Sequence, residues 1–242
     1  MDGRRLPDST LEVSHVPAEG LRERKKRLMR QLLSDTATAM FLEHGFDAVR
    51  VAQVASVCGV SEKTVFNYFP VKEALVMDRL ETTLTALCTA LADRALTPVQ
   101  ATLTVLDGEL SALTGRLTAD ADADAEAEAD TDADESREAI RRFGDLIRAT
   151  PALRAYLADM TDRSAAAAAG VLAARAGMTA DEPEPQIAAR ALLGLWRVQA
   201  DSLRRHLSQA AAPTLLHERV SADVRRAAEL IDTGLRAFAA AA

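Results

Sequence analysis

Cysteine is scarce in this chain: only Cys58 and Cys88 occur among 242 residues, in separate predicted helices. Neither belongs to a C-x-x-C motif or has a histidine at ligand spacing, so the sequence indicates neither a disulfide framework nor a metal site. We interpret both thiols as small core residues of a protein in a reducing compartment. The four histidines are scattered. No nucleophile elbow, phosphate-binding loop or dinucleotide fingerprint is present, so neither an enzyme nor a cofactor is expected.

Long apolar runs and aromatic residues are also missing. No stretch is apolar enough to cross a bilayer and the N-terminus is polar, which predicts a cytoplasmic protein without anchor or signal peptide. Aromatic residues make up 4% of the chain, whereas hydrophobic residues as a whole make up 48%. Ala and Leu are abundant and β-branched residues do not alternate, so the sequence predicts an all-α protein. Its length fits a small N-terminal unit and a larger helical one.

The net charge of -7 is unevenly distributed. From Ala119 to Glu135 nine residues are acidic and none is basic, so the rest of the chain carries a net charge of +2. Between Gly20 and Arg30, six residues are basic and one is acidic. The whole-chain charge therefore hides a basic segment of the kind that meets nucleic acid.

Two segments are predicted to lack regular structure. A helix over residues 119–135 would stack like charges four residues apart without an opposing partner, so we expect a mobile acidic loop there. An intramolecular DNA mimic, or a contact for a basic partner, is the functional alternative. Residues 1–20 contain two prolines and little periodicity, which predicts a flexible arm.

The stretch from Ala48 to Lys72 has the pattern of two short helices joined by a tight turn. Apolar residues at i, i+3 and i+4 define the first helix, and Gly59, which tolerates positive φ, ends it. Ser61 is placed to accept hydrogen bonds from the free N–H groups that open the second helix. That helix turns Val65 and Phe69 inward and leaves five residues pointing away, namely Glu62, Lys63, Thr64, Asn67 and Tyr68.

Longer helices are predicted on both sides of this pair. Apolar residues at spacings of three and four indicate a helix over 21–44, ended by Gly45, with the basic cluster in its first turns. Pro70 ends the second short helix, and a helix over 72–93 connects the pair to the rest of the chain. Further helices are predicted over 99–117, 136–148, 151–176, 185–207 and 215–239.

With these helices in place, the sequence resembles the TetR family of transcriptional regulators over roughly Leu21 to Leu80. The matching residues are Phe41-Leu42-Glu43-His44-Gly45-Phe46, Val51, Val54-Ala55, Gly59-Val60-Ser61, Thr64-Val65-Phe66, Tyr68-Phe69 and Lys72-Glu73-Ala74-Leu75. A bare helix-turn-helix pattern occurs in many folds, but this longer series is specific. The resemblance implies an N-terminal three-helix DNA-binding domain and a larger C-terminal helical domain for effector binding and dimerisation.

The resemblance also implies which side chains meet the bases of double-stranded DNA. Glu62, Lys63 and Thr64 occupy the start of the recognition helix, with Asn67 and Tyr68 beside them. Lys63 is the expected guanine contact in the major groove. Glu62 either accepts from cytosine N4 or only disfavours mismatched bases.

Phosphate contacts are expected around this reading helix. They come from Arg50, from Lys72 and from the basic cluster, including Arg22, Lys25 and Lys26. Arg50 stands where the family usually has a small hydroxyl residue, so this chain loses a helix cap and gains a cation. The affinity for DNA should therefore fall steeply as the salt concentration rises.

In the C-terminal domain the resemblance implies a small-molecule pocket among the middle helices. The aromatic, sulfur-containing or large residues suited to line it are Leu84, Cys88, Phe143, Tyr156, Met160 and Trp196. An ordinary core position is the alternative for each. Arg190 and Arg197 share a face with few apolar neighbours, so we interpret them as surface residues. Burial of either in a cavity would indicate an anionic effector.

The resemblance further implies a homodimer formed by the last two helices. Its two recognition helices would enter successive major grooves of a near-palindromic operator. The apolar stripes of these helices consist of Ile187, Ala191, Gly194, Leu195, Val198 and Ser202, and of Val220, Val224, Ala227, Ile231, Leu235 and Phe238. Closure of a monomeric core is the alternative for both stripes.

These inferences divide the chain into three segments. They are a flexible arm over 1–20, a helix-turn-helix DNA-binding domain over 21–72, and an effector-binding and dimerisation domain over 73–242. The expected function is a ligand-responsive transcriptional regulator, a repressor released from its operator by a small molecule. An activator and a ligand-independent DNA-binding protein of the same fold are the alternatives, and an enzyme is a third.

Overall fold

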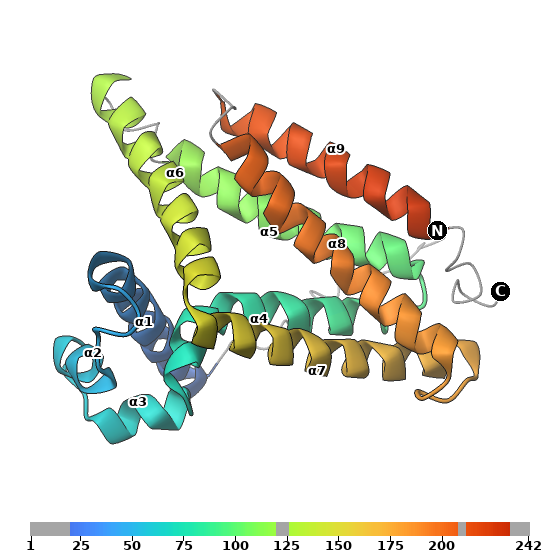
Figure 1. Ribbon diagram of the computed structural model, residues 1–242, viewed down its shortest axis with the longest axis horizontal. Helices are drawn as coiled ribbons and strands as arrows, with labels where there is room; N and C mark the ends of the chain where they lie inside the picture. Colours follow the sequence, from blue (N-terminus) through green and yellow to red (C-terminus); the bar gives the residue numbers. More distant parts are fainter. Residues whose placement is uncertain (1–19, 120–125, 208–211, 233–242) are drawn as a thin grey trace, which may run out of the picture.

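The computed structural model describes residues 20–119, 126–207 and 212–232. Within these ranges every regular element is an α-helix and no strand occurs, so the all-α prediction is confirmed. The elements are α1 (Leu21–His44), α2 (Val51–Val57), α3 (Glu62–Tyr68), α4 (Lys72–Ala90), α5 (Pro98–Ala119), α6 (Glu126–Ala149), α7 (Pro151–Ala176), α8 (Pro183–Leu207) and α9 (Pro213–Asp232) (Figure 1). The predicted arm, apart from Gly20, and the predicted helical turns at 233–239 lie outside the described residues.

The first three helices form a small unit at one end of the molecule, where α1 packs against α4 (Figure 1). On α1 the residues at i, i+4 and i+8, Leu33, Ala37 and Phe41, are at most 1% exposed. Val54 of α2 and Val65 of α3 close the same core. Full burial of each large apolar side chain stabilises the unit by about 1.5–3 kcal/mol, which fixes how the short helices sit on α1.

The helix α4 belongs to both halves of the molecule. Its beginning contacts α1, and along its length it contacts α7 and α5 (Figure 1). Beyond it, α8 packs against α7 and α9, and α5 packs against α9. A second connection comes from α6, which also contacts α1. The N-terminal unit is thus joined to the larger helical bundle by packing at two places as well as by the chain.

A polar network joins α8 to α9. Asp223 of α9 is 9% exposed and accepts a 2.7 Å hydrogen bond from the Ser202 hydroxyl. Arg205 donates to the same carboxylate at 3.0 Å, Arg226 also pairs with it, and His206 Nε2 lies 3.1 Å away. The Ser202 hydrogen bond is the main cause that lowers the pKa of Asp223 from 3.8 to about 2.

The acidic segment differs from its prediction. We expected a loop from Ala119 to Glu135, but α5 extends to Ala119 and α6 begins at Glu126. The loop prediction is therefore wrong for Ala119 and for 126–135, while 120–125 lie outside the described residues. Alanine and glutamate are good helix formers, and acidic residues are favoured near the positive N-terminal end of a helix. Downstream, Arg137 pairs with Asp134 at 3.0 Å. These terms outweigh the repulsion on which the loop prediction rested.

The two predicted C-terminal stripes face in different directions. On α9, Val220 and Val224 are buried, so that stripe turns into the bundle. On α8, Leu195 and Ser202 are buried, whereas Ile187 is 66% exposed and the residues Ala191, Gly194 and Val198 are half-buried. The α8 stripe therefore lies at the edge of the bundle and leaves apolar surface outside it.

Candidate functional site

The turn between α2 and α3 has the hydrogen bonds of a Schellman motif. The Val60 N–H donates to Ala55 O at 3.0 Å and the Gly59 N–H donates to Ser56 O at 3.2 Å. Gly59 has φ +67°, a left-handed conformation that favours glycine. The free carbonyls of α2 are satisfied in this way, and the chain is redirected within three residues. The predicted role of Gly59 is confirmed.

Ser61 caps α3 as predicted. Its Oγ accepts a 3.1 Å hydrogen bond from the Thr64 N–H, and it lies 2.8 Å from the Thr64 hydroxyl. One of the orphan donors at the start of α3 is therefore satisfied locally. Thr64 is half-buried and its hydroxyl is already engaged with Ser61, which distinguishes it from its neighbours on the outer face.

The outer face of α3 is open to solvent. Glu62, Lys63 and Asn67 are exposed, and Val65 beneath them is fully buried. Tyr68 is half-buried and packs against the core, so only part of its ring is accessible. Phe66 is 43% exposed and lies between Glu62 and Lys63 around the helix, and sequence reasoning did not select it. Its position next to the inward-facing Val65 was the available signal.

The expected phosphate contacts fall into two groups. Arg50 is exposed at the start of α2, as are Arg22, Lys25 and Lys26 in the first turns of α1. The Arg50 side chain makes no cap hydrogen bond to the start of α2. Instead, Gln53 Oε1 accepts a 2.7 Å hydrogen bond from the Arg50 backbone N–H. This reciprocal bond is half of a capping box.

Lys72 is different because it also serves the fold. Its Nζ donates to Phe46 O at 2.5 Å and lies 4.3 Å from the centre of the Phe46 ring and 5.3 Å from that of Phe41. The side chain is half-buried, and burial lowers the pKa of its ammonium group. Lys72 therefore fastens the start of α4 to the end of α1 and the residues that follow it.

Arg30 is the central residue of the α1–α4 junction. Its Nη1 donates to Tyr68 O, at the end of α3, at 2.9 Å, and its Nε donates to Asp78 of α4 at 2.6 Å. The guanidinium lies 4.5 Å from the centre of the Phe69 ring. In the sequence Arg30 belongs to the basic cluster, but it also shares a helix face with Leu33 and Ala37. One side chain thus ties α3 to both α1 and α4.

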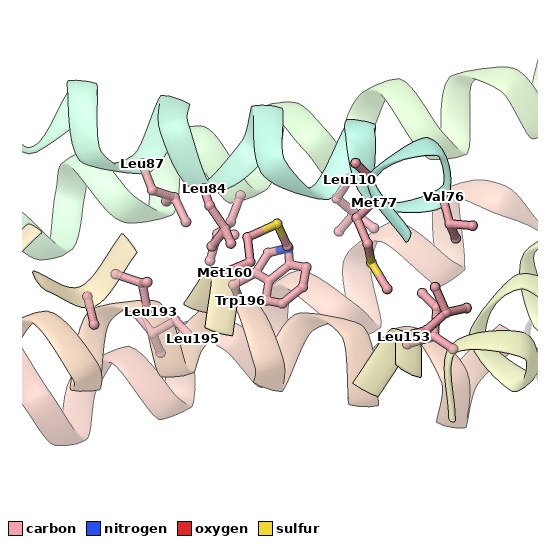
Figure 2. Close-up of a cluster of buried hydrophobic side chains, with 14 of the residues drawn as sticks. Val76, Met77, Leu84, Leu87, Leu110, Leu153, Met160, Leu193, Leu195 and Trp196 are labelled. Atoms are coloured by element: carbon pink, nitrogen blue, oxygen red, sulfur yellow. The ribbon is translucent and has the colours of Figure 1, made fainter. Parts of the chain in front are cut away.

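The predicted effector residues are only partly brought together. Leu84, Met160 and Trp196 are buried in one cluster between α4, α7 and α8 (Figure 2). Cys88 is half-buried, and its Sγ donates to Ser164 O at 3.5 Å. The remaining two, Phe143 and Tyr156, are half-buried on α6 and α7.

The exposure of two arginines bears on the class of effector. Arg190 and Arg197 are both exposed, so their interpretation as surface residues is confirmed. Arg190 donates to Gln186, and Arg197 pairs with Asp201. The condition that we set for an anionic effector, a buried Arg190 or Arg197, is therefore not met.

Glu109 on α5 is a residue that sequence reasoning missed. Its Oε1 accepts from the Thr83 hydroxyl at 3.2 Å and its Oε2 accepts from Gln199 Nε2 at 3.3 Å. The side chain is half-buried, and this burial raises the pKa of its carboxyl, with the hydrogen bonds from Thr83 and Trp196 acting in the opposite direction. A glutamate inside the apolar stripe between Leu106 and Leu110 was the signal in the sequence.

Three further findings concern metal sites, membrane spans and grooves among the described residues. In the described ranges, no three His, Cys, Asp or Glu side chains come together as a metal site. No helix that the structure describes is long and apolar enough to cross a membrane. An open groove of about 670 Å³ follows α4 beside Arg30, lined by Asp78, Thr85 and Thr89 among others. None of the predicted effector residues lines it.

The chain shows similarity to solved structures. A TetR-family transcriptional regulator described as putative, from Mesorhizobium loti, is 18% identical, with 85% of this chain and 98% of that chain covered and a TM-score of 0.44. A tetR-family transcriptional regulator from Streptomyces coelicolor is 21% identical, with 88% and 87% covered and a TM-score of 0.36. No curated protein matches the chain.

Two family models match the chain in succession. Residues 33–77, which include the Schellman turn, the Ser61 cap and the Lys72 anchor, match bacterial regulatory proteins of the tetR family. Residues 121–240, which include α7, α8 and α9, match the MftR C-terminal domain. The chain therefore belongs to the TetR family of transcriptional regulators, with a DNA-binding helix-turn-helix at its N-terminus.

Proposed function

We propose that the protein is a homodimeric repressor that leaves a near-palindromic operator when a small molecule binds its C-terminal helices. The observation that carries this proposal is the solvent-exposed outer face of α3, where Glu62, Lys63 and Asn67 stand on a capped helix seated over a buried core. A short rigid helix with an exposed polar face fits the major groove. Membership of a family of regulatory proteins favours a regulator over an enzyme.

The proposed base contacts follow from exposure. Lys63 contacts guanine, Glu62 accepts from cytosine N4 or only disfavours mismatched bases, and Asn67 contacts adenine N6 and N7. The exposed ring of Phe66 adds an apolar contact for a thymine methyl group. Thr64 and Tyr68 are both half-buried, so only the accessible part of each side chain contacts the DNA.

The proposed phosphate contacts surround this face. Arg50 and the exposed basic residues of α1, including Arg22, Lys25 and Lys26, neutralise the backbone on either side of the groove. The Lys72 ammonium has donors left after its bond to Phe46 O, so it can serve the fold and a phosphate together. Such contacts position the protein and make the affinity depend on salt.

The proposed dimer uses α8 and α9. Ile187 on α8 and Leu230 on α9 are 66% and 84% exposed, and the small residues Ala191 and Gly194 allow close approach of a second copy. A two-fold axis through this surface would set the recognition helices roughly 34–36 Å apart, one turn of DNA. The compartment proposed for such a DNA-binding protein is the cytoplasm.

The proposed route from effector to operator runs through α4 and α6. Arg30 joins α4 to the end of α3, and Arg142 of α6 donates to Leu42 O, one of the unpaired carbonyls at the end of α1. A shift of either helix would therefore tilt the reading unit. An activator, or a DNA-binding protein without an effector, remains the alternative within the same fold.

Capture of genomic DNA by the purified protein tests the proposal. A repressor of this kind should retain a small set of near-palindromic sites and release them when the right metabolite is added. Retention without release by any metabolite would favour the ligand-independent alternative. Failure to retain any specific site would contradict the regulator altogether.

Substitution of Lys63 tests the residue assignment on the captured operator. Lys63→Ala should lower the preference for guanine at one position by about 1–3 kcal/mol. Arg50→Ala should weaken binding to all operator variants alike. It should also reduce the slope of log affinity against log salt concentration by about 1, the loss of one phosphate contact. An equal loss from both variants across all operator sequences would refute base reading by Lys63.

A further inference from the structure

Glu109 places a carboxylate among three packed helices. It projects from α5 and reaches Thr83 of α4 at 3.2 Å and Gln199 of α8 at 3.3 Å. Gln199 is 6% exposed, so the acceptor end of Glu109 lies against the interior face of α8. The carboxylate is therefore held inside the C-terminal bundle by groups from both neighbouring helices.

The donors around Glu109 are all neutral. A hydroxyl, a side-chain amide and the Trp196 indole N–H are its hydrogen-bond partners, and within the described ranges no Lys, Arg or His forms an ion pair with it. Acidic side chains are normally buried only when they are paired. Burial of a carboxylate costs hydration free energy, and without a counter-charge no ionic attraction offsets that cost. A bound cation would supply that attraction.

The buried side chains next to Glu109 are apolar and aromatic. Trp196 and Gln199 are three residues apart on α8 and share a face, and Thr83 directly precedes Leu84 on α4. Figure 2 shows Trp196, Leu84 and Met160 gathered in one cluster. The cluster offers an aromatic ring to a cation and apolar side chains to the rest of a molecule.

We propose that Glu109 is the counter-ion of the effector, and that the effector is an organic cation with an apolar body, bound between α4, α5, α7 and α8. This inference rests on the proposed function, which makes the C-terminal helices the effector-binding half. The ammonium group binds the Glu109 carboxylate beside the Trp196 ring, and the apolar body packs against Leu84 and Met160. Anionic effectors are disfavoured because Glu109 repels them and Arg190 and Arg197 are on the surface.

Trp196 provides the means to test this site, because it is the only tryptophan in the chain. Decylammonium, decanol and decanoate share one apolar chain and differ in charge, so the purified full-length protein is titrated with each below its aggregation concentration. Trp196 fluorescence reports binding. We expect decylammonium to bind about 30-fold more tightly than decanol, and decanoate to bind most weakly.

Two variants separate the Glu109 charge from general effects. Glu109→Gln keeps the shape of the side chain and should reduce decylammonium affinity about 30-fold while leaving decanol affinity unchanged. Asp107→Asn removes the same charge from an exposed residue on the same helix and should change decylammonium affinity less than about twofold, as expected for a screened charge. Preference for decanoate or decanol, or equal losses in the two variants, would overturn the proposal.

The operator experiment distinguishes this inference from the function on which it rests. If an operator is retained but decylammonium does not bind through Glu109, the counter-ion assignment fails alone. If decylammonium binds through Glu109 and no operator is retained, the regulatory function fails and the cation site stands. Binding in either case is read from Trp196 without DNA.

Discussion

Asp223 and Glu109 are both enclosed by the C-terminal helices, but their surroundings have opposite effects. Asp223, between α8 and α9, receives a hydroxyl hydrogen bond from Ser202 and is paired with two arginines and a histidine. Its pKa falls to about 2. Glu109, between α4, α5 and α8, receives neutral donors only, and its pKa is raised by burial. The difference separates a carboxylate that holds two helices together from one whose counter-charge is missing.

At the helix-turn-helix end, Arg30 follows the pattern of Asp223, whereas burial lowers the pKa of Lys72. Arg30 meets a carboxylate, a carbonyl and an aromatic ring, and Lys72 meets a carbonyl and two rings. Each half-buried cation there has partners from more than one element. The charge of Arg30 is therefore compensated by Asp78, whereas Glu109 meets neutral groups only, a difference that a cationic ligand would explain.

The largest effect should come from removing the charge of Asp223. Asp223→Asn weakens charge-assisted hydrogen bonds to Ser202 and two arginines, so the free energy of unfolding should fall by about 2–3 kcal/mol. Urea denaturation at a fixed protein concentration measures this change. Asp201→Asn, which affects exposed pairs with Arg197 and Arg204, is the control and should cost under about 1 kcal/mol. Equal losses would show that Asp223 is no anchor.

The stabilisation by Asp223 should also depend on pH. Because the pKa of Asp223 is about 2 in the folded protein and its ordinary value is 3.8, its contribution is complete above pH 3.8. The contribution is lost as the pH falls through about 2. The stability difference between the wild type and Asp223→Asn should therefore shrink on acidification below pH 3.8, measured by denaturation at each pH.

A smaller effect is expected from Arg30. Arg30→Ala leaves Asp78 and Tyr68 O without their donor, so stability should fall by about 1.5 kcal/mol. Operator affinity should fall as well, because the end of α3 loses its link to α1 and α4. Arg79→Ala, which removes an exposed pair with Asp35, is the matched control and should leave both quantities nearly unchanged. Unchanged operator binding by a folded Arg30→Ala protein would contradict the coupling role.

The local signals in the sequence predicted the reading unit well. Gly59 and Ser61 act on residues within five positions of themselves, so their roles in the turn and the cap could be inferred from spacing alone. The loop prediction for the acidic segment was wrong because it considered only like-charge repulsion. It left out the helix-forming tendency of alanine and the favourable interaction of acidic residues with a helix N-terminus. Local rules were reliable where one term dominated and failed where several small terms competed.

The contacts that define the interior sites could not be read from the sequence. Arg30 is 48 residues from Asp78, and Glu109 is 90 residues from Gln199, so their partners depend on how the helices pack. Helical periodicity does place Glu109 inside an apolar stripe, but it does not say whether a cation faces it. The packed structure was needed to show that Arg30 is compensated and Glu109 is not.

The smallest effect, and the only gain, should come from Glu109. Glu109→Gln removes a half-buried charge that has no counter-ion and keeps a group able to bond Thr83 and Gln199, so the ligand-free protein should gain about 1 kcal/mol. Thermal or urea denaturation without added amine measures this gain. Asp107→Asn should not produce it, because Asp107 is exposed and lies 3.3 Å from His217.

The gain from Glu109→Gln should also depend on pH, with a sign opposite to that of Asp223. Because burial raises the pKa of Glu109 above 4.5, the folded protein binds this proton more tightly than the unfolded chain. The cost of the charge is therefore full at neutral pH and is relieved as the pH falls through the raised pKa towards 4.5. The stability advantage of Glu109→Gln over the wild type should shrink on acidification. An advantage that stays constant between neutral pH and pH 4.5 would mean that Glu109 is already compensated in the ligand-free protein.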